Sequence, residues 1–270
     1  MFHFSLNAST IRPTPLLEKI RIAAACGYEG IELWHMELDE FERSGGSLTD
    51  LRRRLEDARL RVPSTINLKN WFESDRDDGP EWDECRRRMQ QAVDVGAMCI
   101  VAGPPLVTTD WERGIRNFQR LLRLGKEIGI NPAMEFLGFV EQVNTLESAL
   151  EIIDRSGDPQ AQLVLDPFHI FRGAGDFASV QKLRGSQIAV CHINDAAAEP
   201  PAHLQKDADR VMIGEGILDL KKMIWDLDTI GYEGFISLEL FSEDLWRRDP
   251  HELAKLGLDR MQTLVAELSP

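Results

Sequence analysis

The chain has 270 residues, of which 43% are hydrophobic, so it can bury a sizeable core and is not a disordered protein. Lys and Arg total 31 against 45 Asp and Glu, and the resulting net charge of -14 repels a phosphate backbone, which makes nucleic acid a poor partner. The four cysteines form no C-x-x-C pair, which argues against a disulfide framework or a thiolate metal site and favours a reducing cytoplasm.

The chain opens on residues 1–7, an apolar run with no basic segment before it, which predicts a strand and not a secretion signal. No stretch of about 18 uninterrupted apolar residues follows, so we expect a cytoplasmic protein without a membrane span. Similar short apolar runs recur along the chain and predict eight strands. These are Phe2–Asn7, Gly30–Trp34, Pro63–Asn67, Cys99–Gly103, Ala133–Phe136, Gln162–Asp166, Ile188–Asn194 and Phe235–Leu240.

Segments with helical periodicity lie between these strands. They are Pro15–Cys26, Leu48–Leu60, Trp82–Val95, Trp111–Ile128, Thr145–Arg155, Leu218–Ile230 and, after the last strand, Glu252–Leu268. A sixth helix, expected around Phe177–Leu183, is only weakly marked. Gly27, Gly96, Gly129 and Gly231 each end a helical segment shortly before a strand, as the C-cap residue of a helix does.

Strand and helix therefore alternate along the whole chain, which predicts a parallel sheet. Eight such units without a linker favour closure into a barrel over an open doubly wound sheet, and 270 residues lie within the range of one such barrel. We predict a single (β/α)8 TIM barrel over residues 1–270. Its longest irregular segment is Ala196–Gly216, and long loops in compact domains are often functional.

The fifth to eighth predicted strands each end in a side chain that can bind a divalent metal: Glu135, Asp166, His192 and Glu239. Alternation along the last strand turns Leu238 toward the helices and Glu239 toward the barrel interior, and the same parity turns the other three inward. Such side chains converge at the C-terminal mouth, where barrel active sites lie. Three buried carboxylates and one imidazole are costly without a cation, so the set predicts one divalent metal ion.

Any one of these four residues alone is better explained as an ordinary polar side chain at a strand end, and only their combination favours a metal. One nitrogen and no sulfur suit Mn²⁺, Zn²⁺, Co²⁺ or Mg²⁺ and do not distinguish among them. Glu32 and Trp34 share an inward parity on the second strand, which places both near the pocket, although a lone aromatic such as Trp34 is more often barrel core.

Six short segments of the C-terminal half carry a further pattern. They are EFLG at residues 135–138, VNT at 143–145, LVLDPFH at 163–169, HIND at 192–195, DRV with GEG within 209–216, and SLELF at 237–241. In this order they resemble the xylose isomerase-like TIM-barrel superfamily of sugar isomerases, epimerases and endonuclease IV. Their amino-acid sequences are most similar to those of the inosose (2-keto-myo-inositol) isomerase branch. The N-terminal half is similar only through Gly27–Leu33 and Thr65–Trp71.

The resemblance implies roles for particular residues. The four residues at the strand ends would be the metal ligands, with Glu135 and Glu239 also acting as proton carriers. His169 and Arg210 would hold substrate oxygens. Without the resemblance, His169 is equally well explained as a cap of the next helix, and Arg210 as a solvated surface residue.

An α-hydroxyketone bound through two oxygens to a divalent cation has an acidified α-proton, because the cation stabilises the enediolate oxygen. The expected activity is therefore that of a metal-dependent isomerase or epimerase of a keto-sugar or inosose in carbohydrate metabolism or inositol catabolism. The proton would move through a metal-stabilised enediolate. The expected partner is a small polyhydroxy ketone, without nucleic acid or membrane, and the oligomeric state is open.

Three alternatives remain. A dehydratase or lyase of a keto-polyol, of the inosose or dehydroshikimate type, would use the same metal site. An endonuclease-IV-like phosphodiesterase needs a trinuclear site, for which the six histidines of this chain are too few at strand ends, and the charge of -14 opposes DNA binding. A non-catalytic sugar-binding barrel would bind the metal without turnover.

Overall fold

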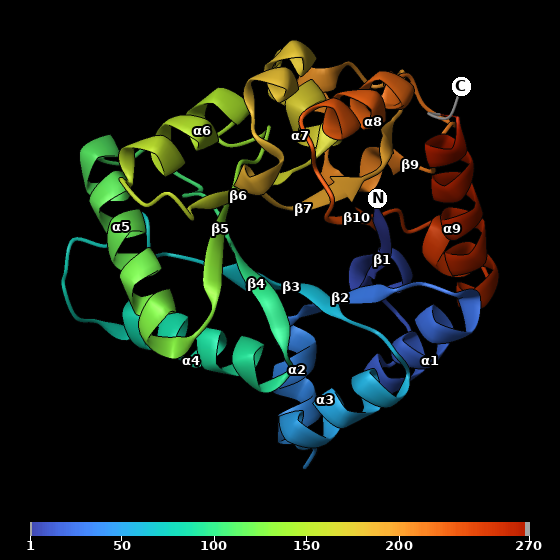
Figure 1. Cartoon of the computed structure of the whole chain (residues 1–270), viewed down its shortest axis with the longest axis horizontal. Coiled ribbons are helices and arrows are strands. Elements are labelled where there is room, and N and C mark those ends of the chain that lie inside the picture. Colours follow the sequence, from blue (N-terminus) through green and yellow to red (C-terminus); the bar gives the residue numbers. More distant parts are fainter. Residues whose placement is uncertain (1, 268–270) are drawn as a thin grey trace.

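The computed structural model describes residues 2–267, and a closed barrel of parallel strands lies at its centre (Figure 1). The eight barrel strands are β1 (His3–Asn7), β2 (Gly30–Trp34), β3 (Val62–Leu68), β4 (Ala97–Ala102), β5 (Asn131–Glu135), β6 (Gln162–Leu165), β7 (Ile188–Ile193) and β10 (Phe235–Leu238). The strands follow one another in sequence order, and β10 closes the barrel by pairing with both β7 and β1. The predicted (β/α)8 barrel is confirmed.

Helices surround the strands (Figure 1). They are α1 (Leu16–Cys26), α2 (His35–Arg43), α3 (Leu48–Asp57), α4 (Pro80–Asp94), α5 (Trp111–Ile128), α6 (Leu146–Arg155), α7 (Pro167–Arg172), α8 (Leu220–Thr229) and α9 (Pro250–Ala266). At the seam where the barrel closes, α1 packs against α9. The Tyr28 hydroxyl donates a hydrogen bond of 2.8 Å to the carbonyl of Ala254 across this seam.

Two connections differ from the prediction. Helix α2 was not predicted, because β2 runs into it directly, with Trp34 at the N-cap position and no capping side chain. The weakly marked helix between β6 and β7 is replaced by α7 and a 3-10 helix at Phe177–Lys182, whose N-cap Asp176 accepts the N–H of Ala178 at 2.8 Å. Leu268, the predicted end of the last helix, lies outside the described residues.

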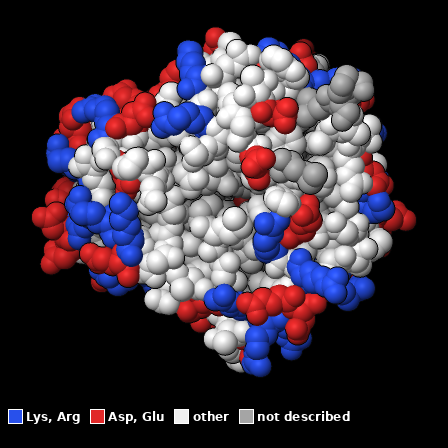
Figure 2. All heavy atoms as spheres, in the orientation of Figure 1, with Lys and Arg blue, Asp and Glu red and all other residues white. Residues whose placement is uncertain are grey.

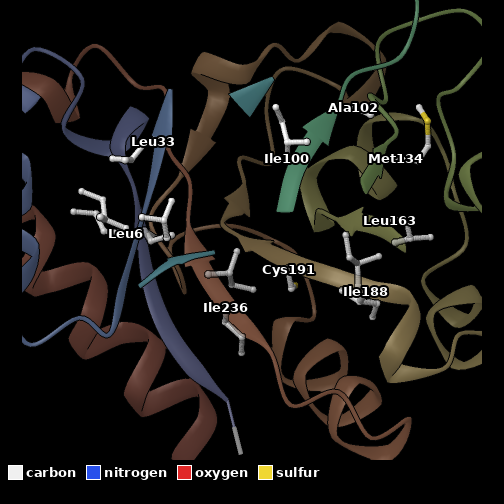
Figure 3. Close-up of a cluster of buried hydrophobic side chains, with 14 of the residues drawn as sticks. Leu6, Leu33, Ile100, Ala102, Met134, Leu163, Ile188, Cys191 and Ile236 are labelled. Carbon is white, nitrogen blue, oxygen red and sulfur yellow. The ribbon is translucent and has the colours of Figure 1, made fainter. Parts of the chain in front are cut away.

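The alternation along the strands separates two apolar layers. One layer lies between strands and helices and includes Met134, Leu165 and Cys191, the residues predicted to face the helices. Figure 3 shows part of it, with Cys191 and Ile236 of the neighbouring strands β7 and β10 close together. The second layer fills the barrel interior with Ile66, Cys99, Val101, Ala133, Val164, Val190 and Phe235. Because side chains alternate along a strand, a residue two positions after one of these inward-facing residues also faces inward and lies at the C-terminal mouth of the barrel.

The four glycines predicted to end helices have the expected backbone conformation. Gly27, Gly96, Gly129 and Gly231 all have positive φ angles, between 74° and 97°. A residue with a β-carbon is strained in this region, whereas glycine ends the helix there without that cost. The turn positions that separate helix from strand were therefore readable from the sequence.

The long segment between β7 and α8 is tied back to the barrel by one carboxylate. It contains the short antiparallel pair β8 (Asp195–Ala196) and β9 (Arg210–Val211). The two oxygens of Asp195 accept the backbone N–H groups of four residues at 2.9 to 3.1 Å: Ala196, Gly214, Gly216 and Leu218. These bonds fix both ends of the segment that carries Arg210.

Acidic residues are dispersed over the face of the molecule that Figure 2 shows. On the face shown in Figure 2, acidic and basic side chains lie side by side around the periphery, and the centre is largely uncharged. Several pairs form within one helix, as between Arg52 and Glu56 at 2.9 Å and between Arg155 and Glu151 at 3.0 Å. Of the helices within residues 2–267, none is long and apolar enough to cross a bilayer.

Candidate metal centre and active site

The four predicted ligands lie together at the C-terminal mouth of the barrel. Glu135 is the last residue of β5, Asp166 follows β6, His192 lies in β7 and Glu239 follows β10. All four are buried, with at most 6% of their surface exposed. A cavity of about 210 Å³ opens in front of them, with Glu135 and Glu239 in its wall.

The imidazole of His192 lies at the centre of this cluster. Its Nδ1 atom is 3.2 Å from Oε2 of Glu239, 3.7 Å from Oε1 of Glu135 and 3.9 Å from Oδ2 of Asp166. Single ligand atoms of Asp166, His192 and Glu239 all lie within 4.8 Å of one another. Although Nδ1 is buried, it has no hydrogen-bond partner among the described residues.

Neighbouring donors hold the second oxygen of two of the carboxylates. Oδ1 of Asp166 accepts the N–H of Phe168 at 2.8 Å and Nδ2 of Asn194 at 3.1 Å. Oε1 of Glu239 accepts Nδ2 of Asn7 at 3.0 Å. The other oxygen of each carboxylate, Oδ2 or Oε2, is the one directed to His192.

Glu135 is held less firmly. Within the part of the chain that the structure describes, no hydrogen-bond donor binds its carboxylate, and its Oε1 lies 3.7 Å from Nδ1 of His192. It also falls outside the group of three side chains whose ligand atoms lie within 4.8 Å of one another. Of the four carboxylate and imidazole groups, Glu135 therefore has the greatest freedom to move.

The residues present fit a divalent cation. Three carboxylates face one buried imidazole nitrogen that makes no well-aligned hydrogen bond, although Oε2 of Glu239 lies 3.2 Å from it, and such a nitrogen is costly unless a ligand takes it. Mixed oxygen and nitrogen donors suit Mn²⁺, Zn²⁺, Co²⁺ and Mg²⁺. Asp166, His192 and Glu239 could hold such an ion, and Glu135 could join them after a small movement.

Arg210 and His169 border the same cavity. Arg210 is 1% exposed, and its Nη2 lies 2.9 Å from Oδ2 of Asp166 and 3.5 Å from Oε2 of Glu239. Nδ1 of His169 lies 3.3 Å from the backbone nitrogen of Gly138, and its Nε2 lies 3.1 Å from Nη2 of Arg210. Gly138 N–H and Arg210 can only donate, and a neutral imidazole accepts through one nitrogen, so these two hydrogen bonds belong to different tautomers of His169. The guanidinium and the imidazole lie together beside the carboxylates, where both can contact a ligand oxygen.

Comparison with known proteins identifies the family. Residues 20–264 match the family described as "Xylose isomerase-like TIM barrel". The chain belongs to this family. Inosose isomerase of Bacillus velezensis is 27% identical over 97% of this chain and 96% of its own length.

Two further proteins are similar to this chain. The crystal structure of the IOLI protein, solved with a bound zinc atom, superposes with a TM-score of 0.91 at 24% identity and covers 99% of both chains. At this identity the similarity concerns the fold. The 3-dehydroshikimate dehydratase of Pseudomonas aeruginosa is 25% identical over 84% of this chain, which corresponds to 36% of the larger protein.

Burial and charge shift the pKa values of this xylose isomerase-like site in different directions. Burial raises the pKa of Glu135 to about 8, although the charge of His192 opposes the shift. Burial likewise raises the pKa of Glu239 above its ordinary value. For His192, burial lowers the pKa, but Glu239 and Glu32 together outweigh it and the pKa lies well above its usual range. For Asp166, burial raises the pKa, but Arg210, His169, His192 and Asn194 together outweigh it and the pKa lies below its usual range.

Part of the site was not predicted from the sequence. Asn7 of β1 and Asn194 after β7 hold ligand carboxylates. Both are polar residues at the C-terminal end of a strand, and a search of strand ends restricted to ionisable residues does not find them. Glu32 does not line the cavity as expected but lies beneath it, fully buried. Trp34 is half-buried in the cavity wall, where its ring meets Phe241 edge to face, so it is not plain barrel core.

Proposed function

We propose that this chain is a divalent-metal-dependent isomerase or epimerase of a keto-sugar or inosose. The observation that carries the proposal is the buried Nδ1 of His192, which lacks a hydrogen-bond partner and faces three carboxylates beside a cavity. Membership of the xylose isomerase-like family and the similarity to inosose isomerase support it. The proposed ligands of Mn²⁺, Zn²⁺, Co²⁺ or Mg²⁺ are those predicted from the sequence: Glu135, Asp166, His192 and Glu239.

The proposed reaction moves one proton. A bound divalent ion supplies Lewis acidity, which acidifies the hydrogen on the carbon next to a carbonyl group. Glu135 and Glu239 lie three strands apart around the barrel and reach the cavity from two directions. One carboxylate takes the proton, the C–H electron pair forms a C=C bond and the carbonyl pair moves onto oxygen, which leaves an enediolate. The other glutamate, once it has taken up a proton from solvent, returns it to carbon, and the first glutamate gives its proton back to solvent. Return to the same carbon re-forms the original carbonyl group. Return to the neighbouring carbon requires that the hydroxyl proton pass to the former carbonyl oxygen, so that the carbonyl group forms at the other carbon.

The test is turnover in D2O. The metal-reconstituted protein is incubated with inososes and ketohexoses and followed by NMR, and we expect deuterium at the reacting carbon of the product. Turnover with full retention of the substrate hydrogen would contradict proton transfer and indicate a hydride shift or a fully shielded base. If no substrate of either class turned over, the proposed function itself would be wrong.

Arg210 and His169 are proposed to hold substrate oxygens. Arg210→Ala should lower kcat/KM by about 10- to 100-fold, the worth of a hydrogen bond from a charged donor, and His169→Ala by less. Metal content, measured by elemental analysis, should be retained, because the lost guanidinium is a cation next to the site. Arg247→Ala is the control, because Arg247 is an exposed arginine that also pairs with an aspartate, Asp244. A wild-type kcat/KM in Arg210→Ala would rule out its role.

Metal binding should depend on pH in a defined direction. Because the pKa of Glu135 is raised to about 8 and that of His192 is also raised, both hold protons at pH 7 in the metal-free protein, and those protons must leave before a cation binds. Affinity should therefore fall as pH decreases below 8, by up to about tenfold per pH unit for each proton released. Calorimetry in buffers of different ionisation enthalpy measures this release, and a pH-independent affinity would refute it.

A second candidate function is dehydration of a keto-polyol that carries a carboxylate. Lys69 lines the cavity, and within residues 2–267 no carboxylate pairs with it, so its ammonium could bind an anionic group of the substrate. The similarity to 3-dehydroshikimate dehydratase supports this alternative. Product NMR separates the two functions, since a dehydratase releases water and leaves a new double bond. In that case Lys69→Met should raise KM for the anionic substrate and not for a neutral one.

A further inference from the structure

A polar network lies behind the candidate metal centre, on the side away from the cavity. At its centre is Glu32 of β2, which is fully buried. Oε1 of Glu32 lies 3.3 Å from Nε2 of His192 and accepts the hydroxyl of Ser64 at 2.5 Å. Oε2 of Glu32 accepts Nδ2 of Asn7 at 3.1 Å. The two nitrogens of His192 therefore face opposite ways, Nδ1 toward the ligand carboxylates and Nε2 toward Glu32.

We propose that Glu32 is a positioning residue that sets the ring orientation and tautomer of His192 for metal binding. An imidazole that binds a metal through Nδ1 must carry its proton on Nε2. Glu32 accepts a hydrogen bond from that Nε2–H, which holds the ring in one orientation and makes Nδ1 a better electron donor. The role rests on the metal site of the proposed function and deepens it.

A purely structural role does not explain a carboxylate at this position. The barrel interior around Glu32 is filled by apolar side chains such as Ile66, Cys99 and Val101. A buried carboxylate costs free energy that an aliphatic side chain in the same layer would avoid. Polar groups meet both oxygens of Glu32: Ser64 donates to Oε1, Asn7 donates to Oε2, and Nε2 of His192 lies 3.3 Å from Oε1. We therefore attribute the presence of a carboxylate at this position to its contact with His192.

Asn7 couples this network to a second proposed ligand. Its Nδ2 donates to Oε2 of Glu32 at 3.1 Å and to Oε1 of Glu239 at 3.0 Å. Its Oδ1 accepts Nε1 of Trp34 at 2.9 Å and the N–H of Ser9 at 3.0 Å. With every polar atom engaged, the Asn7 amide has one orientation. Glu32 therefore fixes His192 directly and Glu239 through Asn7, so that two of the ligands share one support.

The test compares metal affinities of the full chain, freed of metal and titrated with Zn²⁺ or Mn²⁺ by calorimetry. Glu32→Gln should lower the affinity by about 10- to 100-fold, the usual cost of losing an outer partner of a metal-bound histidine. The amide keeps the shape of the carboxylate but replaces one acceptor by a donor. Whichever way it turns, it cannot accept from both His192 and Asn7.

A spectroscopic readout separates positioning from general damage to the fold. In the Zn²⁺-loaded wild type, the Nε2–H of His192 should give a downfield, slowly exchanging NMR signal, because it is buried and donates to a carboxylate. Glu32→Gln should shift this signal upfield or abolish it. Ser64→Ala keeps the Glu32 carboxylate and loosens it, so it should give a smaller loss of affinity and serves as the second variant if Glu32→Gln does not fold.

Glu37→Gln is the matched control. Glu37 is a largely buried carboxylate of α2 that pairs with the buried Lys19 at 2.5 Å and has no contact with His192. Its loss should lower Tm and leave the metal affinity and the Nε2–H signal unchanged. Wild-type affinity with an unchanged Nε2–H signal in Glu32→Gln would overturn the positioning role.

The outcomes for the role of Glu32 and for the proposed function are distinguishable. If the wild type binds the ion but turns over no ketose or inosose, the proposed function fails, and the affinities still decide the role of Glu32. If the wild type binds neither Zn²⁺ nor Mn²⁺, and neither Co²⁺ nor Mg²⁺ in the same titration, the metal site and the role of Glu32 are both wrong.

Discussion

Replacing Glu135 or Glu239 by glutamine is expected to lower kcat by about 10²- to 10⁴-fold, the usual contribution of a positioned acid or base. The amide has the size of the carboxylate but neither takes nor returns a proton. Both glutamates lie at the cavity wall, and both have raised pKa values because they are buried. Such groups exchange protons near neutral pH more readily than exposed carboxylates do.

The two variants should differ in metal binding. Glu239 belongs to the group of three ligand atoms within 4.8 Å, and Asn7 holds its Oε1, whereas no donor among the described residues holds Glu135. Glu135→Gln should therefore retain the metal better than Glu239→Gln, and both better than Asp166→Asn. Kinetics and elemental analysis on the same preparations measure both effects. Glu141→Gln, at an exposed position of the loop after β5, is the control.

Loss of turnover alone would not establish the proton-carrying role, since a ligand change could also abolish activity. Exchange of the substrate α-hydrogen in D2O provides the second readout. A variant that keeps the metal and the fold but no longer exchanges this hydrogen has lost acid–base chemistry. If Glu135→Gln kept wild-type kcat and exchange with metal bound, the role given to Glu135 would have to be withdrawn.

The fold was predictable because its signals are local. Short apolar runs marked all eight strands, and Gly27 and Gly231 marked turns that need a positive φ angle. Strand ends were less well defined: Asp166 was predicted inside a strand, but it leaves the ladder to cap α7 through the N–H of Phe168. α2 was missed because no capping residue separates it from β2.

The alternation of side chains along the strands was enough to predict that the four candidate ligands point inward. It did not predict which residues contact those ligands from the side away from the cavity. The contact of Glu32 with His192 joins β2 to β7 across the barrel, at a sequence separation that no local pattern reports. The burial of Arg210 was equally unpredictable. It depends on Asp195, which binds the ends of a long loop through backbone N–H groups that carry no sequence signal.

Asp166→Asn and His192→Ala should have the largest effect on the metal itself. Each removes a ligand atom from the group of three that lie within 4.8 Å of one another. The loss of affinity should exceed the roughly 100-fold upper cost of an outer-shell substitution. Metal titration by calorimetry and metal content after purification without chelator measure it.

Folding stability must be followed in parallel, because Asp166 also pairs with the buried Arg210 at 2.9 Å. Asp166→Asn leaves that guanidinium with less compensation, so the metal-free variant should have a lower Tm than the metal-free wild type. The diagnostic quantity is therefore the gain in Tm on adding metal. A ligand at 100 times its Kd contributes about 2.7 kcal/mol to stability, and this gain should vanish in both variants.

Cys191→Ser is the matched control for the strand register. Cys191 is next to His192 in β7, and its side chain belongs to the apolar layer between strands and helices. Burial raises the pKa of its thiol, so it is not available as a thiolate ligand. The serine variant should bind the metal as the wild type does. Metal loss in Cys191→Ser, with retention in His192→Ala, would show that the opposite face of β7 points to the mouth of the barrel.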